Sequence, residues 1–408
     1  MKICLLSYRG NPFCGGQGVY VSRLGAHLAK LGHEVHGVCG PPYPDEVEGI
    51  TWHKVPGLGL FAPGGGQPSM GLGDVLSPVG VYERMALKLG VFSEISAFSW
   101  RAFFEVRRLL NRHRFDILHD NQTLGWGTLP LKALGIPLLA TIHHPLTVDR
   151  QRSFESPTSF GRQLSQSLFF PVGMQQVVSR RMERILTVSE ASRQRIIRDF
   201  GVSASKIHVI PNGVELDLFR PRPHIPKVPG RLLYVGNMGD PNKGVRYLLE
   251  AMALIRRPCH LMVVSAGAGL PGWARDAIQR LGIAHQITFT SQVTPDELAA
   301  CYAQAEVAVF PSLFEGFGLP AAEAMACGLP VVAAHGGGLP EVVGNSGLVV
   351  PTRDPKALAQ AIDHLLANPE ARAGLGQAAR KRAESAFRWE TAAQKLAGFY
   401  QEMIHAHR

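Results

Sequence analysis

One stretch of the sequence indicates the fold most clearly: Glu315-Gly316-Phe317-Gly318-Leu319-Pro320-Ala321-Ala322-Glu323. The apolar run before it, residues 305–311, predicts a short buried strand. Pro320 favours the start of a helix. This order places Glu315 on the loop at the carboxyl end of the strand and Glu323 in the first turn of the helix. Amide N–H groups at a helix start favour anions, and a diphosphate is the anion that we expect there.

Each of the two carboxylates also has a simpler interpretation. Glu323 can stabilise the helix through its dipole, by roughly 0.3–1 kcal/mol, and Glu315 can be a solvated loop residue. The two acids with the spacer Gly-Phe-Gly-Leu-Pro between them form a more specific pattern. It resembles the Glu-x7-Glu signature of the retaining nucleotide-sugar glycosyltransferases of family 4, which have the GT-B fold.

The resemblance extends over most of the chain. Further segments resemble landmarks of the same family and follow one another in the family's order. A single glycine pair after a strand occurs in many α/β proteins, but the ordered set is specific. Its members are Gly15-Gly16-Gln17-Gly18, Thr141-Ile142-His143, Thr187-Val188-Ser189-Glu190, Ile210-Pro211-Asn212-Gly213, Val235-Gly236 and Lys243-Gly244.

Length and strand pattern predict two α/β domains. The 408 residues are enough for two cores of ordinary size. Short apolar runs alternate with helical patterns up to about residue 210, and the alternation restarts after a proline-rich linker, which is typical of parallel sheets covered by helices. The apolar runs are residues 3–6, 35–38, 117–119, 138–142, 232–235, 260–264, 287–290, 307–310, 331–333 and 348–350.

The resemblance implies a GT-B architecture, in which two Rossmann-like domains face a central cleft. Residues 1–212 would form the acceptor-side domain, joined by a C-terminal helix within residues 389–408 that returns to pack on it. Residues 213–388 would bind the nucleotide sugar. Residues 56–80 are rich in Gly and Pro, and we predict no regular structure for them. A long irregular stretch is often functional, and this one lies on the acceptor side.

By the resemblance, three residues are candidates for the chemistry. Lys243 would place an ammonium on the diphosphate, although it can also be an exposed turn lysine. Glu315 would orient the sugar through its hydroxyls, and His143 would face the reacting sugar. His144 points inward instead if the strand ends one residue sooner. The remaining donor-binding candidates are Gly15, Gly16, Asn237, Gly316, Phe317, Gly318, Leu319 and Glu323, the last of these on the ribose hydroxyls.

Two positions depart from the family's pattern. Asn237 stands where an arginine usually shares the diphosphate with the lysine, so one positive charge is missing there. Arg246 is a substitute by proximity only. Ser265 follows a predicted strand where a glycine usually comes first.

The resemblance implies transfer with retention of the anomeric configuration, without a metal or a cofactor. No nucleophile is identifiable, so an oxygen of the leaving diphosphate would help to take the acceptor's proton. The chain has no Asp-x-Asp, and the spacing of its histidines indicates no ligand cluster. We expect a UDP- or GDP-sugar rather than an ADP-sugar as donor, and a glycan, a lipid or a small molecule as acceptor.

The net charge of +10 is uneven, since residues 1–220 hold 24 of the 42 basic residues but 17 of the 32 acidic ones. Arginines at 101, 107, 108, 112 and 114 share a helical stretch with apolar residues, which suits peripheral contact with an anionic membrane or a plain solvated helix face. Without an apolar run near the roughly 20 residues of a membrane span or a signal peptide, the expected location is the cytoplasm, including the inner face of the membrane. We interpret the six cysteines as reduced residues of the core.

Other classes of function fit less well. A nucleic-acid-binding protein would explain the charge, but no helix-turn-helix, stacking motif or zinc pattern is present. A sugar-nucleotide binder that has lost activity is supported by Asn237 and opposed by Lys243, Glu315 and Glu323. Nothing resembles the lysine context of a pyridoxal-phosphate enzyme on this fold. A nicotinamide-dependent dehydrogenase would need the third glycine that Gly16-Gln17-Gly18 lacks.

Overall fold

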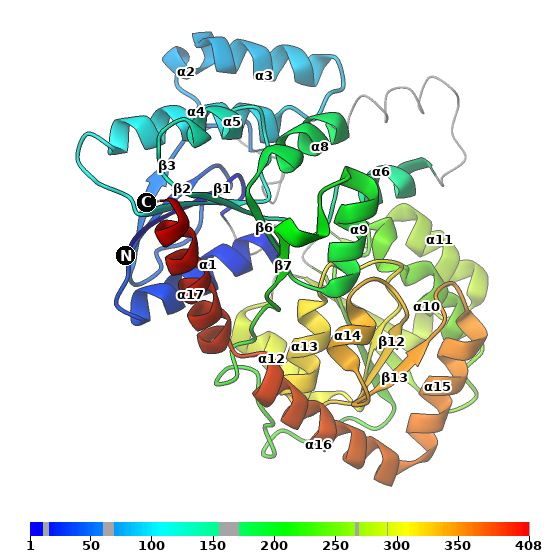
Figure 1. The fold of residues 1–408 in the computed structure, drawn as a ribbon. Coiled ribbons are helices and arrows are strands. Elements are labelled where there is room, and N and C mark those ends of the chain that lie inside the picture. The colour runs from blue at the N-terminus through cyan, green and yellow to red at the C-terminus, as the bar shows by residue number, and fades with distance from the viewer. Residues whose placement is uncertain (11–15, 60–68, 155–170, 266–268, 292, 408) are drawn as a thin grey trace. The chain divides into compact units, whose positions relative to one another are not determined.

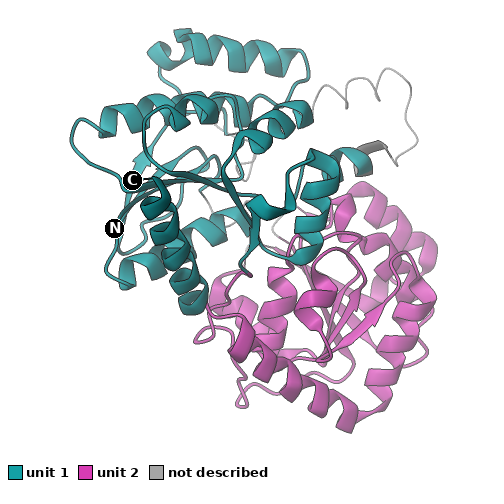
Figure 2. Ribbon diagram, in the orientation of Figure 1, with its two compact units in different colours: residues 1–210, 389–408 teal, residues 211–388 magenta. Residues whose placement is uncertain are grey.

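The structure is a computed structural model that describes residues 1–10, 16–59, 69–154, 171–265, 269–291 and 293–407. The chain divides into two compact units (Figure 2). Unit 1 contains residues 1–210 and 389–408, and unit 2 contains residues 211–388. Each unit is built on its own parallel sheet covered by helices. The predicted α/β class with two parallel-sheet domains is therefore confirmed. The division falls at residue 210, where the sequence analysis placed it at residue 212.

Unit 1 has a sheet of seven parallel strands in the order β3-β2-β1-β4-β5-β6-β7. Four of these strands coincide with predicted apolar runs, whereas β3, β6 and β7 were not among them. Each of these three begins or alternates with polar residues, which hides the apolar signal. The strands are β1 Lys2–Ser7, β2 Glu34–Cys39, β3 Ile50–Lys54, β4 Ile117–Asn121, β5 Leu138–Thr141, β6 Arg184–Thr187 and β7 Ile207–Val209.

The two faces of this sheet carry separate cores. Ile3 and Leu5 of β1 pack with α1 and α17, while Cys4 and Leu6 point to the other face and pack with α4, as the two-residue period of a strand requires. The helices of unit 1 are α1 Gly16–Lys30, α2 Leu72–Leu76, α3 Pro78–Lys88, α4 Glu94–Leu109, α5 Thr128–Lys132, α6 Thr147–Phe154, α8 Val172–Arg181, α9 Glu190–Phe200, a 3-10 turn at Ala204–Lys206, and α17 Trp389–His407.

The C-terminal helix α17 lies beside α1 in unit 1 (Figure 1). Trp389 and Tyr400 are among the largest fully buried side chains. The Tyr400 hydroxyl lies 2.5 Å from Nδ1 of His119 on β4, which ties the helix to the centre of the sheet. The structure thus places the end of the chain against its beginning.

The prediction that residues 56–80 lack regular structure is wrong for their second half. Ser77 caps α3 by accepting a hydrogen bond from the Gly80 amide at 3.1 Å, and Pro78 occupies the first turn. A Cβ atom on Gly80 would lie 2.0 Å from the Asp74 carbonyl oxygen, so glycine is required where α3 passes α2. The glycines and prolines that suggested a loop here support a tight helical pair. Residues 60–68 lie outside the described residues.

Unit 2 has a sheet of six parallel strands in the order β10-β9-β8-β11-β12-β13, and all six were predicted. The strands are β8 Arg231–Val235, β9 His260–Ser265, β10 Ile287–Ser291, β11 Val307–Phe310, β12 Val331–Ala334 and β13 Leu348–Val350. The helices are α10 Val245–Met252, α11 Gly272–Leu281, α12 Pro295–Gln304, α13 Leu319–Ala326, α14 Leu339–Val343, α15 Pro355–Ala367 and α16 Pro369–Ala386, with 3-10 turns at Pro241–Lys243 and Ala284–Gln286.

Both sheets reverse their strand order once, between β1 and β4 in unit 1 and between β8 and β11 in unit 2. In open α/β sheets, ligands bind outside the carboxyl ends of the strands at this switch point. The loops that follow these four strands are therefore where a site is expected. Among the described helices, none is both long and apolar enough to cross a bilayer.

Candidate active site

The turn that carries Lys243 is fixed against the loop that follows β11. Asp240 caps this turn by accepting from the Asn242 amide at 2.8 Å, and the carbonyl oxygen of Asn242 accepts from the amide of Leu313 at 2.7 Å. Gly244 has a φ of +61°, and a Cβ there would lie 2.2 Å from the Pro311 carbonyl oxygen. The close approach of the two loops therefore requires glycine at this position.

This approach brings Lys243 and Glu315 together at the switch point of unit 2. The Lys243 Nζ lies 2.8 Å and 2.9 Å from the two carboxylate oxygens of Glu315. Both side chains are partly exposed, at 23% and 15%. The Ser312 hydroxyl donates to Oε1 of Glu315 at 2.8 Å, and the Gly338 amide donates to the Glu315 carbonyl oxygen at 2.8 Å. Ser312 was missed from the sequence because a lone serine in a loop carries no signal.

The helix α13 begins one residue before the predicted proline. Gly318 precedes it with a φ of +105°, and Leu319 is its first residue. Glu323 is therefore the fifth residue of the helix, so the prediction that it lies in the first turn is wrong. The left-handed glycine lets the chain enter the helix early.

Glu323 is oriented by a tyrosine from the preceding helix. The Tyr302 hydroxyl lies 3.0 Å from Oε2 of Glu323 and 3.1 Å from the Pro320 carbonyl oxygen. Burial, and after it the charge of Glu323, holds the pKa of Tyr302 well above its usual range. Tyr302 therefore remains a hydrogen-bond donor to the carboxylate at neutral pH.

The other donor-binding candidates of unit 2 differ in their environment. Phe317 is buried and packs edge-on against Phe387, with ring centroids 5.3 Å apart, so its side chain serves packing. Asn237 lies exposed on the loop after β8, where its Oδ1 accepts from the Gly239 amide at 2.9 Å. Arg246, the suggested substitute for the missing arginine, is exposed near the start of α10.

In unit 1, His143 follows β5 and lies beside the switch point, because its ring is fixed by Asn121 at the end of β4. The Asn121 Nδ2 donates to the Ser7 hydroxyl and to the Gln17 carbonyl oxygen, each at 3.2 Å. Its Oδ1 is then the acceptor for Nε2 of His143, at 2.8 Å. His143 therefore carries its proton on Nε2, which leaves Nδ1 as the acceptor of the ring. Asn121 was not singled out in the sequence, although it ends β4 beside the reversal of strand order.

The pKa of His143 is lowered to about 3, first by burial and then by the charge of His144. Its ring stands edge-on to Tyr20 of α1 with centroids 4.7 Å apart. Its amide donates to Oε1 of Gln122 at 2.7 Å, and its carbonyl oxygen accepts from the Ser192 hydroxyl at 3.0 Å. His143 is thus neutral at physiological pH, and both its ring and its backbone are fixed by neighbouring side chains.

The structure also answers which of the two adjacent histidines is buried. The strand β5 ends at Thr141, one residue sooner than predicted, yet His143 is the buried one. His144 is half-buried, and its Nε2 lies 3.1 Å from Oδ2 of Asp149. Gly16 is the exposed first residue of α1, and the candidate Gly15 lies outside the described residues.

Two protein families match this chain. Residues 14–218 match the family described as Glycosyltransferase Family 4. Residues 229–368 match the family described as Glycosyl transferases group 1. The boundary between the two matches agrees with the division into two units.

Proteins of known name resemble the chain over its full length. A protein of Mycolicibacterium hassiacum named MMP alpha-(1->4)-mannosyltransferase is 39% identical over 99% of this chain and 98% of its own length. A D-inositol 3-phosphate glycosyltransferase of Streptomyces bingchenggensis is 32% identical over 100% of this chain and 90% of its own length.

Solved structures agree with this assignment. Sucrose-phosphate synthase from Thermosynechococcus elongatus has a TM-score of 0.76 and 26% identity, covering 99% of both chains. The Anabaena protein HepE in complex with UDP-glucose has a TM-score of 0.69 and 18% identity, covering 98% of this chain and 100% of its own, which supports the fold. The chain therefore belongs to the family 4 glycosyltransferases, has the GT-B fold, and is a glycosyltransferase.

Proposed function

We propose that this enzyme moves a hexose from a nucleoside diphosphate sugar to an acceptor hydroxyl with retention of the anomeric configuration. The observation that carries the proposal is the ion pair of Lys243 and Glu315 at the switch point of unit 2. Mannose is the first candidate sugar, because the relative from Mycolicibacterium hassiacum is named as an alpha-(1->4)-mannosyltransferase. An α-linked product formed from an α-linked donor means retention.

Lys243 is proposed to stabilise the diphosphate as the anomeric C–O bond breaks. Negative charge builds on the departing phosphate oxygens, and a preorganised ammonium stabilises it without reorganisation during the reaction. Glu315 holds this ammonium in place before the donor arrives. When the diphosphate competes for Lys243, the Glu315 carboxylate becomes an acceptor for hydroxyls of the sugar.

Glu323 is proposed to accept hydrogen bonds from the ribose hydroxyls, with Tyr302 holding one of its oxygens. This contact exists in the donor complex before and after the bond breaks. It should therefore contribute to donor binding more than to the rate of transfer.

His143 is proposed to orient the reacting sugar as a neutral group, with Nδ1 accepting a hydroxyl hydrogen bond. Its low pKa excludes an imidazolium ion at neutral pH. The acceptor's proton would pass to a phosphate oxygen of the leaving group as the new C–O bond forms on the same face. We propose no metal or cofactor in this step, because Lys243 supplies the positive charge.

Peripheral contact with an anionic membrane is the second element of the proposal. The side chains around α2 and α3 include exposed Leu72, Leu76, Met85 and Leu89, and the nearby α4 exposes Phe104. The side chain of Arg101, however, is only 9% exposed and forms an ion pair with the buried Glu83 at 2.7 Å, so the expectation that it belongs to an exposed basic face is wrong. Sedimentation with phosphatidylglycerol vesicles, lost in a Leu76→Ser/Met85→Ser variant, would support the contact.

The experiment that tests the main proposal is a screen of donors. Thermal unfolding with UDP, GDP or ADP comes first, since a ligand at a hundredfold excess over its Kd stabilises by about 2.7 kcal/mol. We expect protection by UDP or GDP. Hydrolysis of GDP-mannose, UDP-glucose and other nucleotide sugars then identifies the donor, and NMR of the product reports the anomeric configuration. Protection without any turnover would favour the inactive binder that Asn237 suggests, and an inverted product would contradict retention.

A further inference from the structure

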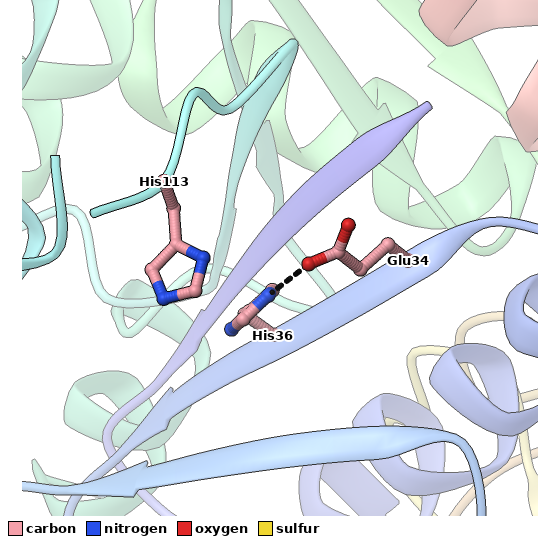
Figure 3. A group of neighbouring side chains, drawn as sticks. All are labelled: Glu34, His36 and His113. Atoms are coloured by element: carbon pink, nitrogen blue, oxygen red, sulfur yellow. Dashed lines mark hydrogen bonds and ion pairs between the residues drawn. The ribbon is translucent and has the colours of Figure 1, made fainter.

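A second group of chemically active side chains lies in unit 1, near the amino end of β2. Glu34 and His36 are two residues apart on this strand and so share one face of it. His113 comes from the turn between α4 and β4 (Figure 3). His53 comes from the adjacent β3. One potential ligand atom from each of Glu34, His36 and His113 lies within 4.8 Å of the other two.

The contacts inside this cluster are ordered. Nε2 of His36 lies 2.9 Å from Oε1 of Glu34, and its Nδ1 lies 2.9 Å from Nε2 of His53. The ring of His113 is tilted by 56° against that of His36, with centroids 4.5 Å apart. The spacing of the histidines in the sequence indicates no ligand cluster, but the fold brings together residues that the sequence separates by nearly eighty positions.

We propose that Glu34, His36 and His113 bind a divalent transition metal ion such as Zn²⁺. Two imidazoles and one carboxylate form a donor set that suits this class of ion, with water in the fourth position. Without an ion, Nε2 of His36 carries the proton and donates it to the carboxylate of Glu34. To bind the ion through Nε2, the ring would take the other tautomer, in which Nδ1–H donates to Nε2 of His53. A metal-binding histidine commonly donates its other N–H in this way, which fixes the ring and its tautomer.

The geometry requires a small adjustment of the side chains. Ligand atoms around a tetrahedral zinc ion lie about 3.4 Å apart, given Zn–N distances of about 2.0–2.1 Å. His36 is buried and fixed, whereas Glu34 is exposed and His113 is half-buried. Oε1 of Glu34, now 2.9 Å from Nε2 of His36, would move slightly away from it, and the ring of His113 can shift to complete the site. A cavity of about 360 Å³ lies beside His113 and is also lined by His53, Arg108 and Arg112.

Positive groups nearby define the competing interpretation. Lys2 Nζ lies 2.9 Å from Oε1 of Glu34, so an ion must displace it or use the other oxygen. Arg108 and Arg112 on the cavity wall would favour a phosphate instead. The carboxylate of Glu34 stands within the cluster itself and repels an anion there, which favours the metal.

The position of the cluster separates it from the chemistry of transfer. Glu34 begins β2, whereas His143 and Asn121 lie at or beyond the carboxyl ends of their strands. The proposed ion would join β2 and the turn after α4, and so would stabilise unit 1 without entering the reaction.

Equilibrium dialysis of the untagged, chelator-treated full chain against Zn²⁺ and Mg²⁺ tests the proposal, together with the absorption spectrum after Co²⁺ is added. We expect one tightly bound Zn²⁺, no Mg²⁺, and the visible bands of four-coordinate Co²⁺. His113→Ala and Glu34→Gln should each weaken Zn²⁺ binding by roughly tenfold or more. The exposed His285 of unit 2 provides the control, since His285→Ala should change nothing.

His113→Ala and Glu34→Gln change residues that are not fully buried, so both variants should fold, which thermal unfolding without metal verifies. Binding of Zn²⁺ that is unchanged in both variants would overturn the proposal, as would no binding to the parent at micromolar concentration. Protection from unfolding by inorganic phosphate, lost in Arg108→Ala and not accompanied by Zn²⁺ binding, would show that the cluster is an anion site instead.

Discussion

The candidate residues beside the two switch points differ in charge and in burial. In unit 2, Lys243 and Glu315 form a charged pair that is partly open to solvent. In unit 1, His143 is buried, neutral and held by Asn121, Gln122 and Ser192. Under the proposed function, unit 2 stabilises the negative charge that develops on the leaving diphosphate. Unit 1 orients the reacting sugar through a neutral side chain. Changes to the charged side should then affect the rate most.

Replacing Lys243 by methionine should have the largest effect. The variant keeps most of the side-chain stem and loses the ammonium, so kcat should fall by about 10²–10³-fold, or roughly 3 kcal/mol of transition-state stabilisation. The KM for the donor should change less. Steady-state kinetics with the donor found in the screen provide the measurement.

Lys356→Met is the matched control for this change. Lys356 is an exposed lysine of α15 in the same unit, so its loss should leave kcat unchanged. If Lys243→Met keeps the parental kcat, the ammonium does not stabilise the leaving group and the contrast between the two units disappears. If Arg246→Ala lowers kcat as strongly as Lys243→Met, this arginine supplies the charge missing at Asn237.

Acid should lower the free energy of unfolding, because unit 1 buries two neutral histidines. Burial lowers the pKa values of His119 and His143 to about 3 in the folded protein, against 6.5 for an unperturbed histidine. The unfolded chain therefore binds more protons below pH 6.5, and the free energy of unfolding falls as the pH drops from 6.5 toward 3. Urea unfolding at a series of pH values measures this slope.

His119→Gln should reduce the slope, because an amide does not titrate in this range, whereas the exposed His224→Gln should not. The variant is compared by its slope and not by its absolute stability. An unchanged slope in His119→Gln would show that this histidine is protonated in the folded state, against the lowered pKa.

The sequence predicted the charged side of the site better than the neutral side. Glu315 and Glu323 lie on a loop and a helix with strong local signals, a glycine turn and an early proline, so their elements could be assigned from neighbouring residues alone. The error in the turn of Glu323 arose because the positive φ of Gly318 starts the helix earlier. Boundaries of this kind depend on a single backbone angle that the sequence does not specify.

The neutral side depends on contacts between distant residues. Asn121 orients His143 across adjacent strands, and Tyr400 reaches His119 from the other end of the chain. Neither asparagine nor tyrosine carries a local signal for such a role. The same reason explains why the cluster of Glu34, His36 and His113 was missed, since its spacing in the sequence has no regularity.

Removing the hydroxyl of Tyr400 should weaken unit 1 by a moderate amount. In Tyr400→Phe, Nδ1 of His119 loses its partner in a buried environment, which costs about 1–3 kcal/mol. Urea unfolding measures the loss, and the KM for the donor should stay near the parental value. Tyr247→Phe, on a half-buried tyrosine of α10, is the control. Equal stability of Tyr400→Phe and the parent would show that this hydrogen bond contributes nothing.

Tyr302→Phe should have the smallest effect. It tests whether Glu323 contributes to donor binding while Lys243 contributes to the rate of transfer. The variant removes the hydroxyl that lies 3.0 Å from Oε2 of Glu323 but keeps the ring, which packs edge-on against Phe219 with centroids 5.8 Å apart. A hydrogen bond to a charged group contributes about 1.5–3 kcal/mol, and water can replace part of it at the half-buried Glu323. The KM for the donor should therefore rise about three- to tenfold while kcat stays near the parental value. A fall in kcat with an unchanged KM would mean that Glu323 acts on the reacting bond. Glu323 on α13 would then act on the leaving group together with Lys243 and Glu315. In that case, binding of the nucleoside and stabilisation of the leaving group would not be separate tasks of different residues in unit 2.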